Sequence, residues 1–153
     1  MDQVVVNRSA PVVGRAEAVI TAPVEVVWDV LSDLEGWPRW NPSVSKMRLD
    51  GPLAVGTSFA WVGGGSRITS KLEQLDRPRR IAWSGKTFGI RAVHVWEFRT
   101  VATGTSVRTE ESFDGWIVRL LPGIMRRMLD RALRDGLDAL KREAEAGPGG
   151  RPT

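Results

Sequence analysis

The chain has 153 residues, of which 42% are hydrophobic and 26% are charged, a balance that predicts one globular domain and excludes a wholly disordered chain. The absence of cysteine excludes disulfides, thiolate catalysis and cysteine-ligated metals. The net charge of +4 comes from 22 basic and 18 acidic residues that are interspersed, so we expect no nucleic-acid-binding surface.

A strand and a helix are predicted at the start of the domain. Residues 15–20 alternate in polarity as a strand does, and residues 1–14 form an N-terminal segment that can be flexible. Pro23 then opens a helix, because proline is tolerated at the first helical position. One face of this helix is apolar at the helical spacing, through Val24, Val27, Trp28 and Leu31.

A second short helix is predicted directly after the first. Ser32 and Glu35 have the spacing of a capping box, in which two side chains satisfy backbone groups at a helix start. Gly36 and Pro38 should end this helix quickly. The bent exit contains two of the seven tryptophans and is a place where the mouth of a pocket could form; they are Trp37 and Trp40.

Short segments separated by turn signals fill the middle of the chain and predict six further strands. These strands span residues 43–49, 57–62, 67–75, 80–85, 91–99 and 105–114. A long amphipathic helix is predicted over residues 118–146, with one apolar face and charges on the other. The glycine-rich end, residues 147–153, predicts a flexible tail.

This order of elements predicts a single α+β domain over residues 15–146. A bent antiparallel sheet of seven strands can wrap around the long C-terminal helix, which buries both apolar faces without a second sheet. The two short helices lie between the first and second strands.

Five separate motifs, in this order along the chain, resemble the START/birch-pollen-allergen (SRPBCC) superfamily, and its polyketide cyclase/dehydrase and lipid-transport branch in particular. The motifs are ITAPVEVVWDVLSDLEGWPRWNPSV, GPLAVGTSF, LDRPRRIAWSG, HVWEF and GTSVRTEESFDG. The resemblance covers about residues 15–145. It implies a helix-grip fold with a cavity between the sheet and the C-terminal helix, where a hydrophobic small molecule binds. The superfamily includes carriers, sensors and cyclases, so the resemblance does not choose among them.

Three hairpin loops predict the register of the sheet. The pairs that close the GGGS, DRPR and VATG loops are Val62 with Arg67, Leu75 with Arg80 and Thr100 with Thr105. By counting outward, Trp83 faces Leu72, Ile81 faces Gln74, and His94 faces Glu111. A slip of one residue would move every side chain to the other face, and this register puts apolar residues together.

The inner face predicted in this way combines large rings with a few polar side chains, as ligand pockets do. The candidate ligand-binding residues on the sheet and the helices are Trp28, Phe59, Trp61, Ser70, Leu72, Trp83, His94, Trp96, Thr109, Glu111, Phe113, Leu129 and Leu133. For any single ring, packing in the core is the better explanation, and only the combination of rings with polar side chains indicates a pocket.

The chain's only histidine, His94, is predicted to lie opposite the carboxylate of Glu111 on this inner face. A buried carboxyl and imidazole are costly unless they pair. The interpretation that we favour is a structural hydrogen bond that joins two strands or holds a ligand's polar end, because nothing beyond the pair indicates chemistry. The other interpretation makes the pair the candidate catalytic dyad for proton transfer.

The leading hypothesis is a binding protein or carrier for a flat, apolar molecule such as an aromatic polyketide or a lipid. The alternative is a cofactor-independent cyclase, dehydratase or isomerase that uses His94 and Glu111. A third reading is a protein-interaction module that contacts a partner through an exposed basic turn at 77–80. We expect no metal, no signal peptide and no stable membrane insertion, a cytoplasmic location, and a monomer or homodimer.

Overall fold

The structure is a computed structural model and describes residues 3–147. Seven antiparallel strands form one sheet, in the order β1-β7-β6-β5-β4-β3-β2. The strands are β1 (Val12–Ile20), β2 (Val44–Leu49), β3 (Ser58–Gly63), β4 (Ser66–Asp76), β5 (Arg80–Thr87), β6 (Ile90–Val101) and β7 (Gly104–Asp114). The helices are α1 (Val24–Ser32), the 3-10 helix η1 (Leu34–Gly36), α2 (Trp37–Trp40), α3 (Trp116–Leu120) and α4 (Pro122–Ala146).

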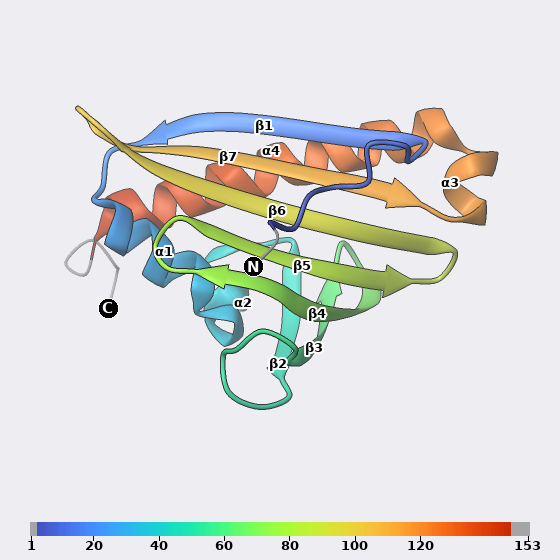
Figure 1. Cartoon of the computed structure of the whole chain (residues 1–153), viewed down its shortest axis with the longest axis horizontal. Helices are drawn as coiled ribbons and strands as arrows, with labels where there is room; N and C mark the ends of the chain where they lie inside the picture. Colours follow the sequence, from blue (N-terminus) through green and yellow to red (C-terminus); the bar gives the residue numbers. More distant parts are fainter. Residues whose placement is uncertain (1–2, 148–153) are drawn as a thin grey trace.

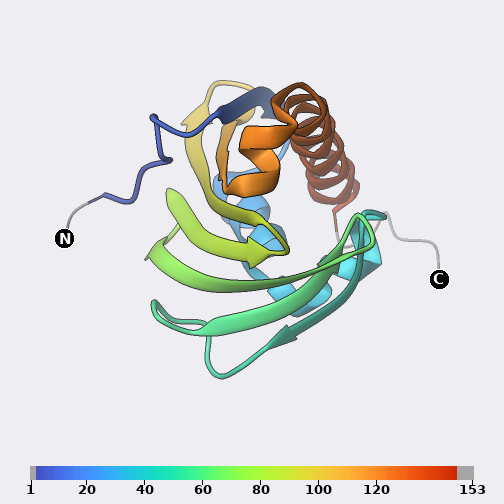
Figure 2. The ribbon, with the colours of Figure 1, turned by 90° about the vertical axis from the view of Figure 1, so that its right-hand side faces the viewer.

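The sheet bends strongly, and the long helix α4 lies across its concave side (Figure 1). Figure 2 shows the same arrangement from one end, with α1 and α2 inside the curve of the sheet. This is the predicted α+β helix-grip fold, with the short helices α1, η1 and α2 between the first and second strands where two were predicted. Among residues 3–147, none of the helices combines the length and hydrophobicity that a membrane crossing requires.

The register predicted for two hairpins is confirmed. Val62 pairs with Arg67 across the first loop, and Thr100 pairs with Thr105 across the third. His94 therefore lies opposite Glu111. Polar and apolar side chains are sorted to opposite faces because side chains alternate along each strand.

The register predicted for the hairpin of β4 and β5 is correct only in the part that lies away from its loop. Trp83 faces Leu72 as predicted, but an irregularity between Leu72 and Gln74 shifts the pairing, so that Ile81 faces Leu75 instead of Gln74. A bulge of this kind adds one residue to one strand and reverses the alternation beyond it. Here it places Leu75 against the main apolar cluster.

Two helix predictions are wrong in detail. Ser32 is the last residue of α1 and caps nothing, so the second helical segment does not begin with a capping box. The predicted helix over 118–146 is two helices, because Leu121 leaves the helical conformation before Pro122, which begins α4. A residue that precedes proline is disfavoured in the helical region, and proline suits a first turn.

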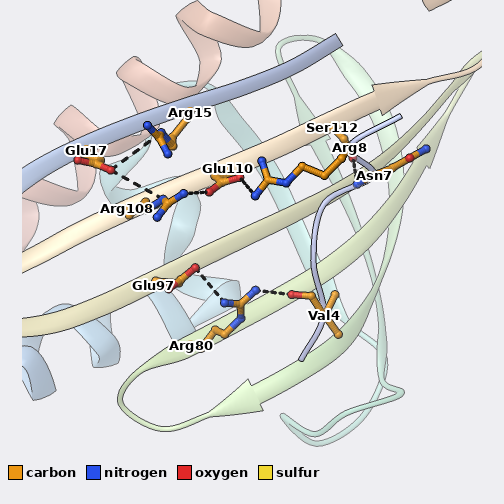
Figure 3. A network of polar contacts seen from close by, with 10 residues as sticks. All are labelled: Val4, Asn7, Arg8, Arg15, Glu17, Arg80, Glu97, Arg108, Glu110 and Ser112. Carbon is orange, nitrogen blue, oxygen red and sulfur yellow. Dashed lines mark hydrogen bonds and ion pairs between the residues drawn. The ribbon is translucent and has the colours of Figure 1, made fainter. Parts of the chain in front are cut away.

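The N-terminal residues pack on the outer face of the sheet (Figure 3). Strand β1 begins at Val12, three residues before the predicted start, and Val6 is buried against the sheet. The buried guanidinium of Arg80 donates to the carbonyl of Val4, and Arg8 lies 3.0 Å from the buried Glu110 carboxylate. Residues 3–11 thus cover polar groups of the outer face. The tail predicted over 147–153 lies outside the described residues apart from Gly147.

Candidate functional site

The inner face of the sheet is lined by aromatic rings that contact one another. Trp37 lies at the centre of this group, with ring centroids 6.3 Å from Phe59, 5.7 Å from Trp61 and 5.3 Å from Trp83. Trp37 is buried, although its place after a predicted helix exit suggested a pocket mouth. Sequence reasoning missed it because α2 turns the ring inward, which only the three-dimensional path of the chain determines.

The predicted residues divide between two apolar clusters. The main cluster, under α1 and the second half of α4, includes Trp28, Phe59, Leu72, Trp83 and Trp96, with Trp61 packed against it. The second cluster, under α3 and the first half of α4, includes Leu129 and Leu133, with Phe113 packed against it. The other predicted residues are polar and belong to neither cluster: Ser70, His94, Thr109 and Glu111.

Three of these polar side chains form a chain on the adjacent strands β6 and β7. Nδ1 of His94 lies 3.3 Å from Oε2 of Glu111, and Nε2 lies 2.7 Å from Oγ1 of Thr109. The imidazole also lies against two rings, with centroids 4.9 Å from Trp83 and 5.4 Å from Trp96. The antiparallel pairing of His94 with Glu111 and of Trp96 with Thr109 positions all four groups.

Burial favours the uncharged forms of both His94 and Glu111. Desolvation lowers the pKa of His94 to about 3 and raises the pKa of Glu111 to about 8. At neutral pH the imidazole is therefore uncharged and the carboxyl is protonated. In that state Nδ1 of His94 faces a protonated carboxyl that is able to donate to it, and Nε2 shares a hydrogen bond with the Thr109 hydroxyl. Both His94 and Glu111 side chains keep 13% of their surface exposed, so solvent reaches one side of the pair.

The indole N–H groups of the inner face differ in how they are satisfied. Trp37 donates to the carbonyl of Leu31 at 2.8 Å, and Trp61 donates to the Ser70 hydroxyl at 3.0 Å. Nε1 of Trp96 is buried and has no hydrogen-bond partner among the described residues. A buried donor without a partner costs free energy, and such groups in native structures call for an explanation.

This difference predicts unequal effects of the same substitution. Trp37→Phe removes a satisfied N–H and leaves the Leu31 carbonyl without its donor, whereas Trp96→Phe removes an N–H that has no partner in the described part of the chain. Because both changes shrink a buried ring equally, Trp37→Phe should lower the free energy of unfolding by about 1–3 kcal/mol more than Trp96→Phe. Urea denaturation of both variants measures the difference, and equal losses would contradict the unpartnered state of Trp96.

None of the predicted ligand-binding residues lines either of two surface clefts, each of about 300 Å³. One lies between the start of β2 and α4, beside Pro42, Asp138 and Arg142. The other lies beside α1 and η1, where Asp33 and Leu49 contribute to its walls. The rings of the inner face lie against one another instead, with the centroid of Trp37 5.3 to 6.3 Å from those of Phe59, Trp61 and Trp83.

The described part of the chain contains no group of three or more His, Asp or Glu side chains that could hold a metal ion. The polar chain of His94, Glu111 and Thr109 therefore offers hydrogen bonds and proton transfer. What it does with them depends on the molecule that reaches it.

Residues 12–145, most of the chain, match the protein family described as polyketide cyclase / dehydrase and lipid transport. The chain belongs to this family. The description covers enzymes as well as carriers of hydrophobic molecules, and the resemblance inferred from the five sequence motifs is confirmed.

Solved structures of other proteins share the fold of this chain. The Zhui aromatase/cyclase from Streptomyces sp. R1128 is 21% identical, with a TM-score of 0.76 over 91% of this chain and 98% of that one. The protein TTHA0849 from Thermus thermophilus is 22% identical, with a TM-score of 0.78 over 89% and 99% of the two chains. A START superfamily protein from Mycobacterium smegmatis is 12% identical, with a TM-score of 0.69 over 88% and 94%.

Proposed function

We propose that this protein binds a flat, largely apolar and uncharged small molecule between the sheet and α4, beside His94 and Glu111. The observation that carries the proposal is the row of Glu111, His94 and Thr109 side chains, which lie within 3.3 Å and 2.7 Å of one another beside tryptophan rings. Rings offer flat apolar contact, and a few polar groups among them orient a ligand.

The polar groups of the inner face favour a neutral ligand. His94 is uncharged at neutral pH because its pKa is lowered, so it supplies no positive charge for a carboxylate, and Glu111 is a hydroxyl donor or acceptor in its protonated form. The N–H of Trp96 has no partner among the described residues, so it can donate a hydrogen bond to a carbonyl of the ligand. Aromatic ketones and quinones fit this set of groups better than ionised fatty acids do.

Entry of such a ligand requires the rings of the inner face to separate. Trp61 and Phe113 are half-buried, and they lie on the main and the second cluster respectively. A hydrogen bond from Trp96 to the ligand then offsets part of the cost of opening.

Titration of the protein with aromatic polyketides, quinones and fatty acids tests the proposal through tryptophan emission. We expect an aromatic ketone or quinone to change the emission saturably, and fatty acids at neutral pH to bind more weakly. Trp96→Phe should weaken ketone binding by about tenfold through the lost hydrogen bond. Trp116→Phe, at an exposed position outside the inner face, is the control and should leave the affinity unchanged. The proposal fails if no member of the panel binds.

A second candidate function is proton-transfer catalysis by a cyclase, dehydratase or isomerase. The observation that favours it is the raised pKa of Glu111, which keeps a proton available at neutral pH next to an imidazole that can accept one. The similarity in fold to the Zhui aromatase/cyclase is consistent with this chemistry. In a dehydration, Glu111 would protonate the leaving hydroxyl as its C–O bond breaks, and the resulting Glu111 carboxylate would accept a proton from the adjacent carbon, which restores the carboxyl group and releases water.

A further inference from the structure

One end of the molecule carries a group of large apolar side chains on its surface. This end patch consists of Phe88, Trp116, Leu120, Leu121, Ile124 and Met128, all of them exposed. Phe88 is 79% exposed and its ring meets that of Trp116 edge to face, with centroids 5.5 Å apart. Figure 1 shows α3 and the turn between β5 and β6 at the same end of the long axis. Contiguous exposed apolar groups of this kind mark interaction sites.

The segments that carry the end patch are also basic. Residues 86–91 and 116–128 contain no acidic residue, and their five basic side chains are exposed: Lys86, Arg91, Arg119, Arg126 and Arg127. The adjacent carboxylate of Asp114 lies 3.6 Å from Arg91 and 3.1 Å from Arg119, so a single carboxylate forms ion pairs with two arginines. The end patch thus has an excess of positive charge around its apolar side chains.

The end patch rests on a firmly packed base. Val118 and Met125 are buried in the second apolar cluster directly beneath it, and Ile117 packs there as well. Gly115 begins α3 so close to the β5–β6 turn that a Cβ atom there would lie 2.2 Å from the carbonyl oxygen of Gly89. The apolar side chains therefore project outward because their own helices and turn are held by other residues.

We propose that the end patch docks this protein onto an anionic lipid surface. Bulky aliphatic and aromatic side chains enter the boundary between headgroups and acyl chains, while nearby arginines meet anionic headgroups. A second copy of the chain fits less well, because a two-fold interface would bring the same positive charges together. A bilayer can receive side chains that project from a turn and two helices at one end, whereas a protein partner would need a matching hollow. Docking concerns this surface alone and does not require a ligand on the inner face.

Sedimentation with lipid vesicles tests the docking. The full chain should sediment with vesicles of equimolar phosphatidylglycerol and phosphatidylcholine and should remain in solution with phosphatidylcholine alone. Leu120→Ser combined with Ile124→Ser should weaken vesicle binding by about tenfold or more. Arg126→Glu combined with Arg127→Glu should weaken it by a similar factor, and added salt should weaken binding of the unaltered protein.

Matched variants elsewhere on the surface serve as controls. Val55→Ser changes an apolar residue that is half exposed and outside the end patch, and Arg99→Glu combined with Arg134→Glu makes the same charge change on other exposed positions. Both controls should bind vesicles as the unaltered protein does. The proposal is overturned if no vesicle sediments the protein, if the end-patch and control variants bind equally, or if Leu120→Ser with Ile124→Ser instead dissociates a dimer in solution.

Discussion

Gly115→Ala should lower the free energy of unfolding by about 4 kcal/mol, because the residue has no room for a side chain and a conformation that only glycine adopts easily. Its φ angle is +122°, and a Cβ atom would lie 2.2 Å from the Gly89 carbonyl oxygen and 3.2 Å from Cα of Ile90. Both neighbours are backbone atoms, so relief requires the β5–β6 turn and the start of α3 to move apart. Urea denaturation followed by circular dichroism measures the loss.

Gly136→Ala is the matched control for this substitution. Gly136 lies within α4, and a Cβ atom there would meet nothing within 4 Å. Alanine should therefore raise the free energy of unfolding by about 0.5–1 kcal/mol through its higher helix propensity. A loss below about 1 kcal/mol for Gly115→Ala would contradict the close approach of α3 to the turn. It would also remove the support for the arrangement of the end patch.

The register of the sheet could be predicted from sequence where the hairpin loops are short and the strands are regular. The loop between Val62 and Arg67 and the loop between Thr100 and Thr105 each fix one pair, and alternation then fixes the rest, including His94 with Glu111. The bulge beside Gln74 could not be predicted in this way. Leu72 and Leu75 both pack inward although their spacing is odd, and only packing against the core selects that arrangement.

The parts of the site that sequence reasoning missed depend on contacts between distant segments. Trp37 enters the ring cluster because α2 directs its side chain toward β3 and β5, and its neighbours Phe59 and Trp83 are remote in the sequence. The packing of residues 3–11 on the outer face depends on Arg80. The sequence predicts Arg80 on an exposed basic turn, and this prediction is wrong because the side chain is buried beneath the N-terminal segment. The functional roles of His94 and Glu111 stay predictions, since only their positions are determined by the fold.

Glu111→Gln should change how the stability of the protein depends on pH. Because its folded-state pKa is raised to about 8, Glu111 stabilises the fold fully below its unfolded value of 4.5 and loses that contribution as pH rises to about 8. His94 acts in the opposite sense: its pKa is lowered from 6.5 to about 3, so its contribution is present above 6.5 and lost as pH falls. Between pH 4.5 and 6.5 the free energy of unfolding should therefore change little with pH, because the decrease due to Glu111 and the increase due to His94 cancel.

The unaltered protein should therefore lose about 2 kcal/mol of unfolding free energy between pH 6.5 and pH 8, the window in which only Glu111 titrates. Glu111→Gln should show no such loss, and its stability should instead rise with pH between 4.5 and 6.5 through His94 alone. Glu25→Gln, at an exposed position of α1, should keep the pH profile of the unaltered protein. Parallel profiles for the unaltered protein and Glu111→Gln would contradict the raised pKa of Glu111.

The same substitution separates binding from catalysis at the inner face. An amide at position 111 keeps the shape of the protonated carboxyl and can still donate to Nδ1 of His94, but it has no proton to transfer. If the protein is a carrier, Glu111→Gln should bind its ligand about as well as the unaltered protein. If it is a cyclase or dehydratase, turnover should fall by about 10²–10⁴-fold while affinity changes little. Because His94 is the only histidine, its imidazole signals in NMR report the state of the pair directly. Imidazolium signals at pH 6 would mean that His94 and Glu111 form an ion pair, and proton donation by Glu111 would then be ruled out.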